Sequence, residues 1–398
     1  MSAGSVVARH YQTRQPVTLT WSEGRITAIE PATRPPAQDV WIAPGLIELQ
    51  INGYANVNYW SLPLSTEDLT TSMRCLRRDG VSRILLTLTT DHWPQMIAKL
   101  KAVQAARKQS PEVRAAIAGF HFEGPFMSNV AGYVGAHEPH KMIDPTAAHI
   151  RELRELTGSD PVLLTMAPER NGVIEAIRLA ASLGMRVSMG HTNASKEVIA
   201  AAIDAGLSAY THFGNGIPQA IDRHDNILWR VLQFPSVTLG VIPDGVHVSP
   251  AFFRIIHRMV DPKKLYYTTD AVHPGGMPPG TFKFGDMDMV VGEDQVVRKP
   301  GETNFSGSAL RPLEGVFRAV EMLGCAWQDA WVRFSQQPAD FMGMGELLAP
   351  GQPADFCLID HDANAPTTVR SYAGGDLRST LPAAARMRSA GIEVAAKT

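Results

Sequence analysis

Short apolar segments alternate with longer amphipathic segments from about residue 44 onward. Apolar runs of about four to eight residues are typical of buried strands, whereas apolar residues at every third or fourth position indicate helices. Eight apolar runs are the candidate strands, at residues 46–51, 83–88, 117–122, 162–166, 186–189, 208–211, 237–242 and 265–269. Strands that alternate with helices form parallel sheets, and eight such units favour a closed barrel over an open sheet. The pattern therefore predicts an α/β protein with a (β/α)8 TIM-type barrel over residues 44–345.

Both ends of the chain show a different pattern. The first forty residues alternate in short strand-like pieces broken by Pro and Gly, and the segment GELLAPGQPADFCLIDHDA returns to short strands. We expect residues 1–43 and 346–398 to form one small β-sandwich domain beside the barrel. Within the barrel region, residues 281–299 are typical of a hairpin insertion, and helices are expected at 312–323 and 327–334.

Polar side chains recur at the carboxyl ends of the predicted strands. This is the face of a (β/α)8 barrel where catalytic groups gather, because the loops there vary while the strands hold them in place. A single strand-end histidine is more often a hydrogen-bonded structural residue, but polar groups at six strand ends indicate a shared site. These groups are Gln50, Asn52, His121, Glu123, His191, His212, Asp244, His247 and Asp270.

Three of these residues form a candidate metal site. Glu123, His191 and His212 offer one carboxylate oxygen and two imidazole nitrogens, a set that suits Zn²⁺ or Fe²⁺ and leaves a position for water. Asp270 is placed to take a proton from the activated water and hand it to a leaving group. Gln50 and Asn52 are neutral amides, which bind transition metals poorly. The sequence therefore predicts one divalent metal ion per chain, with zinc as the favoured ion.

Composition excludes several classes of protein. Lys and Arg total 37 against 39 Asp and Glu, a net charge of −2, so the surface lacks the positive field of a nucleic-acid binder. No uninterrupted apolar run reaches the roughly 18 residues of a membrane helix. The cysteines Cys75, Cys325 and Cys357 are far apart and form no CxxC pair, and the N-terminus lacks the pattern of a signal peptide. We expect a cytoplasmic protein without a nucleic-acid or membrane partner.

Motifs along nearly the whole chain resemble those of the amidohydrolase superfamily. They are, in order, APGLIELQINGY, FHFEGPFMS, GAHEPH, TMAPE, VSMGHTNAS, THFGNGIP, IPDGVHV, TTDAVHPGG and GQPADFCLID. Within that superfamily the chain resembles the N-acetylglucosamine-6-phosphate deacetylase family. The resemblance implies a barrel with a β-sandwich, a homodimer, and hydrolysis of the N-acetyl group of N-acetylglucosamine 6-phosphate to acetate and glucosamine 6-phosphate.

The resemblance also implies a role for individual residues. Glu123, His191 and His212 match the family's metal ligands, and Asp270 matches its general acid and base. His137 or His247 would donate a hydrogen bond to the substrate, and a guanidinium is a planar fork that suits phosphate. The positions that match substrate contacts are Ala136, His137, Asn215, Gly216, Arg223, His247, Ser306 and Gly307.

Two departures from the family pattern leave alternatives open. Gln50 and Asn52 stand where many amidohydrolases carry HxH, although one branch of the deacetylases has the same pair and works with one metal. The phosphate-side segment reads FGNGIPQAIDRHDN, in which Asp225 close to Arg223 would repel a dianion. The alternatives are a related amidohydrolase for a non-phosphorylated amino sugar, an N-acyl amino acid or a cyclic amide, and a non-catalytic scaffold. The complete set of ligands with Asp270 disfavours the scaffold.

Overall fold

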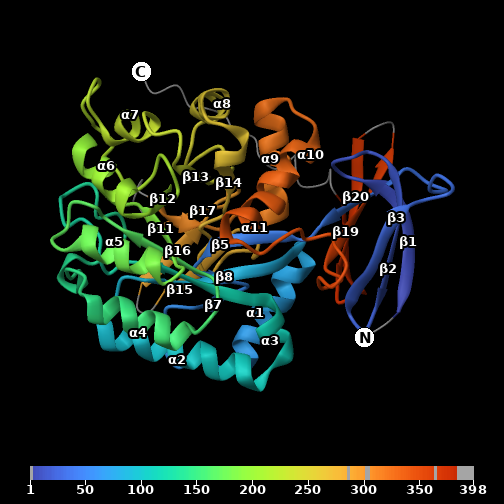
Figure 1. Ribbon diagram of the computed structural model, residues 1–398, viewed down its shortest axis with the longest axis horizontal. Coiled ribbons are helices and arrows are strands. Elements are labelled where there is room, and N and C mark those ends of the chain that lie inside the picture. Colours follow the sequence, from blue (N-terminus) through green and yellow to red (C-terminus); the bar gives the residue numbers. More distant parts are fainter. Residues whose placement is uncertain (1–2, 285–286, 301–304, 363–364, 383–398) are drawn as a thin grey trace.

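Eight parallel strands form a barrel at the centre of the protein (Figure 1). The computed structural model describes residues 3–284, 287–300, 305–362 and 365–382. Each barrel strand pairs with the next one along the chain, and each lies on one of the predicted segments. The strands are β5 (Leu46–Ile51), β8 (Val81–Thr89), β9 (Ile117–Glu123), β10 (Val162–Met166), β11 (Arg186–Met189), β12 (Leu207–Tyr210), β13 (Thr238–Val241) and β14 (Leu265–Tyr267). The predicted (β/α)8 barrel is confirmed.

The barrel closes where the first and last strands meet, just beyond their carboxyl ends. Ile51 forms a parallel bridge with Ala271. The Asp270 N–H donates to the Gln50 carbonyl at 3.0 Å, and the Asn52 N–H donates to the Ala271 carbonyl at 2.7 Å. Closure therefore places the segment after β14 directly beside the end of β5.

A buried carboxyl group, that of Glu48, reinforces this closure from inside the barrel. Its Oε1 accepts from the Gln50 N–H at 3.0 Å and from the Thr268 hydroxyl, and its Oε2 accepts from the Thr269 N–H at 2.8 Å. Burial raises the pKa of Glu48 to about 7, although these donors favour the charged form. One side chain thus links the first barrel strand to the segment that follows the last.

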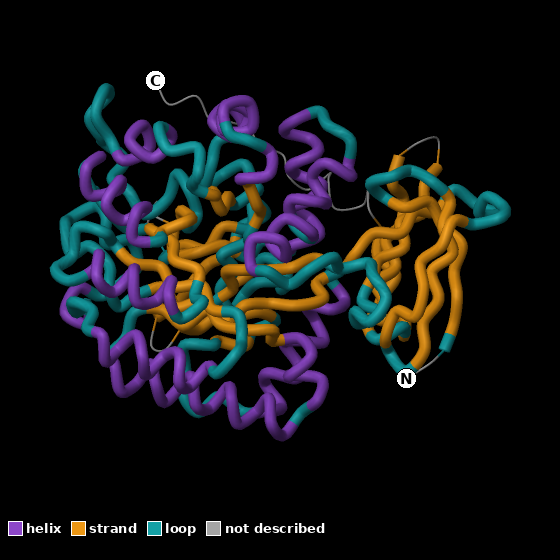
Figure 2. The backbone as a smooth tube through the Cα atoms, viewed as in Figure 1, coloured by secondary structure: helices purple, strands orange, loops and turns teal. Residues whose placement is uncertain are grey.

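Helices cover the outside of the barrel (Figure 2). Side-chain caps begin several of them: Ser65 caps α1, Thr146 caps α4 and Asn226 caps α7. The expected helices at 312–323 and 327–334 are confirmed as α9 and α10. The helices are α1 (Thr66–Arg78), α2 (Trp93–Gln109), α3 (Pro111–Ala116), α4 (Ala147–Thr157), α5 (Val173–Ser182), α6 (Lys196–Ala205), α7 (Ile227–Leu232), α8 (Pro250–Met259), α9 (Pro312–Leu323), α10 (Trp327–Arg333) and α11 (Gln336–Met342), with 3-10 turns at Pro139–Lys141 and Pro262–Lys264.

In the described part of the chain, every helix is too short or too polar to cross a membrane.

Strands from both ends of the chain form a second sheet at one side of the barrel (Figure 1). Its order is β21-β20-β19-β4-β1-β2-β3. Two strands separate β2 from β19 in this order, yet the rings of Trp21 and Phe356 on them lie 5.4 Å apart, so the sheet folds over on itself. The expected β-sandwich is confirmed. Its strands are β1 (Gly4–His10), β2 (Pro16–Ser22), β3 (Arg25–Pro31), β4 (Val40–Pro44), β19 (Phe356–Asp362), β20 (Ala365–Ala373) and β21 (Asp376–Pro382).

An antiparallel insertion follows β14 where a hairpin was expected. It consists of β15 (Gly280–Phe284), β16 (Met287–Val291), β17 (Val296–Arg298) and β18 (Phe305–Ser308). Ser308 at the end of β18 bridges to Ala271, so the insertion returns to the barrel beside Asp270. A small hairpin of β6 (Gly53–Tyr54) and β7 (Val57–Asn58) follows β5.

Replacing Glu48 by alanine removes the acceptor of three buried donors at the closure. An unsatisfied buried donor costs roughly 1–3 kcal/mol, so we expect Glu48→Ala to lose about 3 kcal/mol of unfolding free energy in urea at pH 5. Glu155→Ala, at an exposed carboxylate on α4, is the control and is expected to change stability by less than about 0.5 kcal/mol. If Glu48→Ala loses less than about 1 kcal/mol of unfolding free energy, the hydrogen bonds of Glu48 do not stabilise the closure of the barrel.

The same variant has an expected pH dependence. Because the pKa of Glu48 rises from its ordinary value of 4.5 to about 7 on folding, the folded state binds this proton more tightly. The resulting stabilisation is complete below about pH 4.5 and is lost as the pH rises through 7. The difference in unfolding free energy between wild type and Glu48→Ala should therefore become smaller between pH 5 and pH 8. An unchanged difference would contradict the raised pKa.

Candidate metal centre and active site

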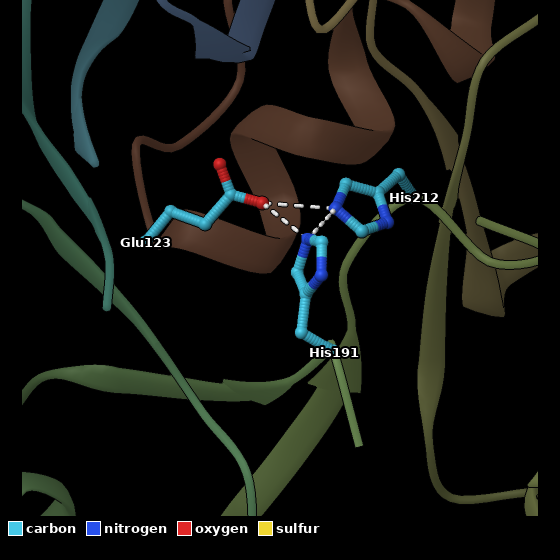
Figure 3. A group of neighbouring side chains, drawn as sticks. All are labelled: Glu123, His191 and His212. Atoms are coloured by element: carbon cyan, nitrogen blue, oxygen red, sulfur yellow. Dashed lines mark hydrogen bonds and ion pairs between the residues drawn. The ribbon is translucent and has the colours of Figure 1, made fainter. Parts of the chain in front are cut away.

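Three side chains converge at the carboxyl ends of the barrel strands (Figure 3). Glu123 ends β9, and His191 and His212 follow β11 and β12. The Nε2 atom of His212 lies 2.9 Å from Oε1 of Glu123, the Nε2 atom of His191 lies 3.5 Å from it, and the two Nε2 atoms are 3.1 Å apart. Among the described residues, this is the one group of three or more His, Cys, Asp or Glu side chains whose ligand atoms all lie close enough to hold a metal ion.

The hydrogen bonds around the triad suit a metal ligand set. The Nδ1 atom of His191 lies 2.9 Å from the Tyr133 carbonyl, which can only accept, so Nδ1 carries the proton and the Nε2 lone pair faces Glu123. Burial alone would raise the pKa of Glu123, but the adjacent rings of His191 and His212 hold it well below its usual value. Converging lone pairs and a charged carboxylate repel one another unless a cation lies between them. The donor set therefore fits a divalent cation.

The backbone is strained at two residues of the triad and at Asp270. His191, His212 and Asp270 have φ angles of 49°, 38° and 51°, in the left-handed region that non-glycine residues avoid. Each stands shortly after a barrel strand. Such strain costs about 1–3 kcal/mol per residue and is found mostly at functional sites.

Two glycines leave room for the His191 ring. A Cβ atom at Gly135 would lie 2.5 Å from Cε1 of His191, and one at Gly216 would lie 2.8 Å from Nδ1. Both glycines have positive φ angles, +63° and +66°. The ring of His137 meets the same imidazole edge-on, with 4.4 Å between centroids. The orientation of His191 is thus fixed by its close neighbours as well as by its hydrogen bond.

Asp270 stands beside the triad and is held by Asn52. The Asn52 amide Nδ2 donates to Oδ1 of Asp270 at 2.7 Å. Burial and the negative charge of Glu123 raise the pKa of Asp270 to about 7, while His212, His247 and Asn52 act in the opposite direction. A carboxyl group with a pKa near neutrality is suited to both accept and return a proton.

Most of the other predicted contact residues lie on loops at the same end of the barrel. Ala136 and His137 lie on the loop after β9, and Asn215 and Gly216 lie on the loop after β12. Asn215 donates from Nδ2 to the His212 carbonyl at 3.3 Å. His247 follows β13, and its Nδ1 lies 2.5 Å from Oδ2 of Asp244.

The β18 strand carries the two remaining positions, Ser306 and Gly307, and reaches the barrel beside Asp270. Gly307 has a φ angle of +106°, and a Cβ atom there would lie 2.7 Å from Cγ1 of Val272. The side chain of Ser306 lies outside the described part of the structure.

Arg223 is the predicted phosphate contact. Its side chain is exposed on the loop before α7, and its guanidinium forms no hydrogen bond or ion pair within the described chain. The expected repulsion from Asp225 is offset, because Asp225 pairs with the Arg230 guanidinium at 2.6 Å. Asp222 accepts from the N–H groups of His224 and Asp225, which shapes the loop.

Sequence patterns missed several supporting contacts. Tyr133 holds His191 through a backbone carbonyl, which no residue type reveals. Glu48 could have been found from the period-two polar pattern along β5, because alternate residues of a strand share one face and Gln50 and Asn52 were already candidates. Asp244 and His247 are three residues apart, a separation at which side chains can form local hydrogen bonds. This spacing is only a weak sign that the two side chains pair.

A (β/α)8 barrel that gathers a carboxylate, two imidazoles and an aspartate at its strand ends defines a metal-dependent amidohydrolase. The chain is 31% identical over 325 residues to the N-acetylgalactosamine-6-phosphate deacetylase of Shewanella sp. (strain ANA-3), covering 81% of this chain and 79% of that protein. It is 30% identical over 351 residues to the N-acetylglucosamine-6-phosphate deacetylase of Bos taurus, covering 84% and 83%. The chain belongs to the N-acetylglucosamine-6-phosphate deacetylase family.

Solved structures agree with this assignment. The N-acetyl-D-glucosamine-6-phosphate deacetylase of Mycobacterium smegmatis superposes with a TM-score of 0.80 at 28% identity, covering 95% of this chain and 100% of that one. The N-acetylglucosamine-6-phosphate deacetylase of Thermotoga maritima has a TM-score of 0.79 at 23% identity, covering 94% and 98%, which shows the shared fold. No protein-family model matches the chain.

The close contact of Gly216 with His191 leads to a prediction for cation binding. In Gly216→Ala the added Cβ would displace the ring, so we expect the affinity for zinc, used as the probe ion, to fall at least about tenfold in a titration. Gly324→Ala is the matched control, because its φ angle is +62° and no atom lies within 4 Å of the added Cβ. Equal affinities in both variants would show that the ring tolerates displacement.

Proposed function

We propose that the chain is a metal-dependent deacetylase that hydrolyses the N-acetyl group of an amino-sugar phosphate, with N-acetylglucosamine 6-phosphate as substrate and acetate and glucosamine 6-phosphate as products. One observation carries the proposal: Glu123, His191 and His212 meet beside Asp270 at the carboxyl end of the barrel. The family relationship supports the substrate class, since relatives are named for N-acetylglucosamine 6-phosphate and N-acetylgalactosamine 6-phosphate.

The roles of the chain's own groups follow from their positions. The triad would hold the cation, and the chemistry supplied by a bound divalent ion is Lewis acidity toward water and an acyl oxygen. Asp270 takes a proton from the attacking water and returns it to the nitrogen of the departing amine. Asn52 fixes one oxygen of Asp270, and the other oxygen, which accepts no hydrogen bond from the described residues, would make this transfer.

We propose zinc as the native ion, with one ion per chain. The ligand set of one carboxylate and two imidazoles supports zinc. A second ion would need donors from the end of β5, where Gln50 and Asn52 carry neutral amides and Asn52 already donates to Asp270.

The chain's organisation supports two further proposals. We propose a β-sandwich domain of residues 1–43 and 346–398 and a barrel domain of residues 44–345, because β4 ends at Pro44 and β19 begins at Phe356. Residues 383–398 lie outside the described part of the structure. We also propose a cytoplasmic location, which the free thiols of Cys75, Cys325 and Cys357 support.

We propose a homodimer in which Arg223 reaches the phosphate in the neighbouring subunit's pocket. The exposed guanidinium without a partner among the described residues supports this arrangement. The Arg230 pairing of Asp225 leaves the positive charge of Arg223 uncancelled by its neighbour, which favours a phosphorylated substrate over a neutral one.

A substrate panel tests the proposed reaction. Purified protein is assayed for acetate release from N-acetylglucosamine 6-phosphate, N-acetylgalactosamine 6-phosphate and their unphosphorylated sugars. We expect the 6-phosphates to be hydrolysed. Equal rates on unphosphorylated sugars would support the alternative amidohydrolase, and no release from any sugar would overturn the proposal.

Asp270→Asn should keep the fold and the metal but lose turnover. An amide cannot accept the proton of the attacking water, and general acid and base groups contribute roughly 10²–10⁴ in rate. We expect kcat to fall by that factor and elemental analysis to give one zinc per chain in both proteins. Asp204→Asn, at an exposed position on α6, is the control. Loss of metal in Asp270→Asn would make Asp270 a ligand, and kcat above about a tenth of normal would exclude it as the base.

Arg223→Ala tests the phosphate contact and the dimer together. A hydrogen bond to a charged group is worth roughly 1.5–3 kcal/mol, so KM for N-acetylglucosamine 6-phosphate should rise about tenfold to a hundredfold. The contact is the same in the ground and transition states, so kcat should change little. Mixing with Asp270→Asn under subunit exchange should restore part of the activity.

The matched control is Arg178→Ala, at an exposed arginine on α5, which should leave KM unchanged. An unchanged KM in Arg223→Ala would mean that another group binds the phosphate. If the KM rises but mixing restores nothing, each pocket is built from a single chain.

A further inference from the structure

The motif TMAPE ends at Glu169, just after β10, and its residue types alone indicate no role. In the barrel, β10 lies between β9, which carries Glu123, and β11, which leads to His191. The chain after His191 forms a short turn before α6 begins at Lys196. Glu169 reaches this turn from the neighbouring strand end.

The carboxylate of Glu169 holds the first residues of the turn. Its Oε2 accepts from the Thr192 hydroxyl, and its Oε1 accepts from the Asn193 N–H at 2.9 Å. The Thr192 oxygen in turn accepts from the Ala194 N–H at 3.1 Å. Thr192 is fully buried, so water is a poor substitute for the carboxylate. The residue that directly follows His191 is therefore fixed by Glu169.

The far end of the turn is anchored by a different group. The Arg230 guanidinium on α7 donates to Oδ1 of Asn193 and to the Ala194 carbonyl, both at 3.1 Å. Loss of the Glu169 carboxylate would therefore release Thr192, while the rest of the turn stays attached to α7.

The backbone of His191 needs support from its surroundings. Its φ angle of 49° lies in the left-handed region, and a non-glycine residue keeps such a conformation only where neighbouring contacts enforce it. The Ser128 N–H donates to the His191 carbonyl at 3.1 Å, and Thr192 is the next residue of the chain. If Thr192 shifts, the strain at His191 can relax and the imidazole changes direction. Its Nε2 would then leave the positions 3.1 Å from Nε2 of His212 and 3.5 Å from Oε1 of Glu123.

Resting on the proposed function, we propose that Glu169 is a positioning residue: through Thr192 it holds His191 in the strained conformation that the metal site requires. Residues that orient a metal ligand typically contribute roughly tenfold to a hundredfold to metal affinity. Glu169 acts on the chain that carries a ligand and is itself neither a ligand nor a catalytic residue.

A zinc titration of Glu169→Ala tests the proposal without reference to turnover. Metal-free protein is titrated with zinc, used as the probe ion, against a competing chelator. We expect the affinity for zinc to fall at least about tenfold. Glu175→Ala, at an exposed carboxylate on α5, is the matched control and should bind zinc as the wild type does. Equal affinities in the two variants would overturn the proposal.

Substitutions at Thr192 show whether Glu169 acts through this residue. Thr192→Val removes the hydroxyl with little change of volume and should weaken zinc binding at least about threefold, whereas Thr192→Ser keeps the hydroxyl and should restore wild-type affinity. Because the two side chains act together, the double variant of Glu169→Ala and Thr192→Val should lose less affinity than the sum of the single losses. Fully additive losses would overturn the proposal.

Unfolding in urea separates positioning from a purely structural role. If Glu169 only stabilised the fold, Glu169→Ala would lower the unfolding free energy of the metal-free protein and leave its zinc affinity unchanged. That result would overturn the proposal. If Glu169→Ala does not fold, Thr192→Val decides in its place, and an unchanged zinc affinity in Thr192→Val would overturn the proposal.

The two proposals fail in different ways. If wild type releases acetate but Glu169→Ala binds zinc with normal affinity, only the role of Glu169 is overturned. If wild type binds zinc yet releases acetate from no N-acetylated sugar phosphate, the proposed function fails, whereas the titrations still decide the role of Glu169. If wild type binds neither zinc nor iron(II), both proposals are overturned.

Discussion

Closure of the barrel between its first and last strands is the constraint on which the active site depends. The backbone link between Gln50 and Asp270 and the carboxyl of Glu48 hold two segments together that lie about two hundred residues apart in the chain. The same junction brings the Asn52 amide to Asp270. A shift of one residue at this junction would turn the side chains of the strand to the opposite face. The position of Asp270 is thus a consequence of barrel geometry.

Around this junction the site compensates buried charge by pairing. Two imidazoles lie beside Glu123, His247 pairs with Asp244, and the hydrogen bond described for the Asp270 side chain comes from the neutral amide of Asn52. Asp270 is accordingly the carboxyl whose pKa moves toward neutrality, while the pKa values of Glu123 and Asp244 fall. Three chemically similar carboxyl groups therefore differ in pKa because their neighbours differ.

The sequence predicted the architecture well because its signals are local. Each barrel strand is an apolar run, and the expected insertion and the helices after it lie where the pattern placed them. The family was also predicted, from motifs that stand at the strand ends. Glu123, His191 and His212 were selected by residue type and position, and the structure brings them together.

The contacts that orient these groups were harder to predict. The Tyr133 carbonyl is a backbone group, so the side chain at that position carries no information about it. The positive φ angles of His191 and His212 oppose local preference, and tertiary structure imposes them. The exposed position of Arg223 also depends on how the preceding loop folds. Sequence patterns thus indicate which residues belong to the site. The hydrogen bonds that orient their side chains form only in the folded chain.

The seven-stranded sheet has a consequence for biosynthesis. Strand β4 pairs on one side with β1 and on the other with β19, which leaves the ribosome more than three hundred residues later. Until then one edge of β4 carries unpaired N–H and C=O groups, and such edges readily pair with other chains. The N-terminal strands therefore cannot mature as an independent unit during translation. Nascent chains that stop within the barrel would retain this open edge and would depend on chaperones to avoid aggregation.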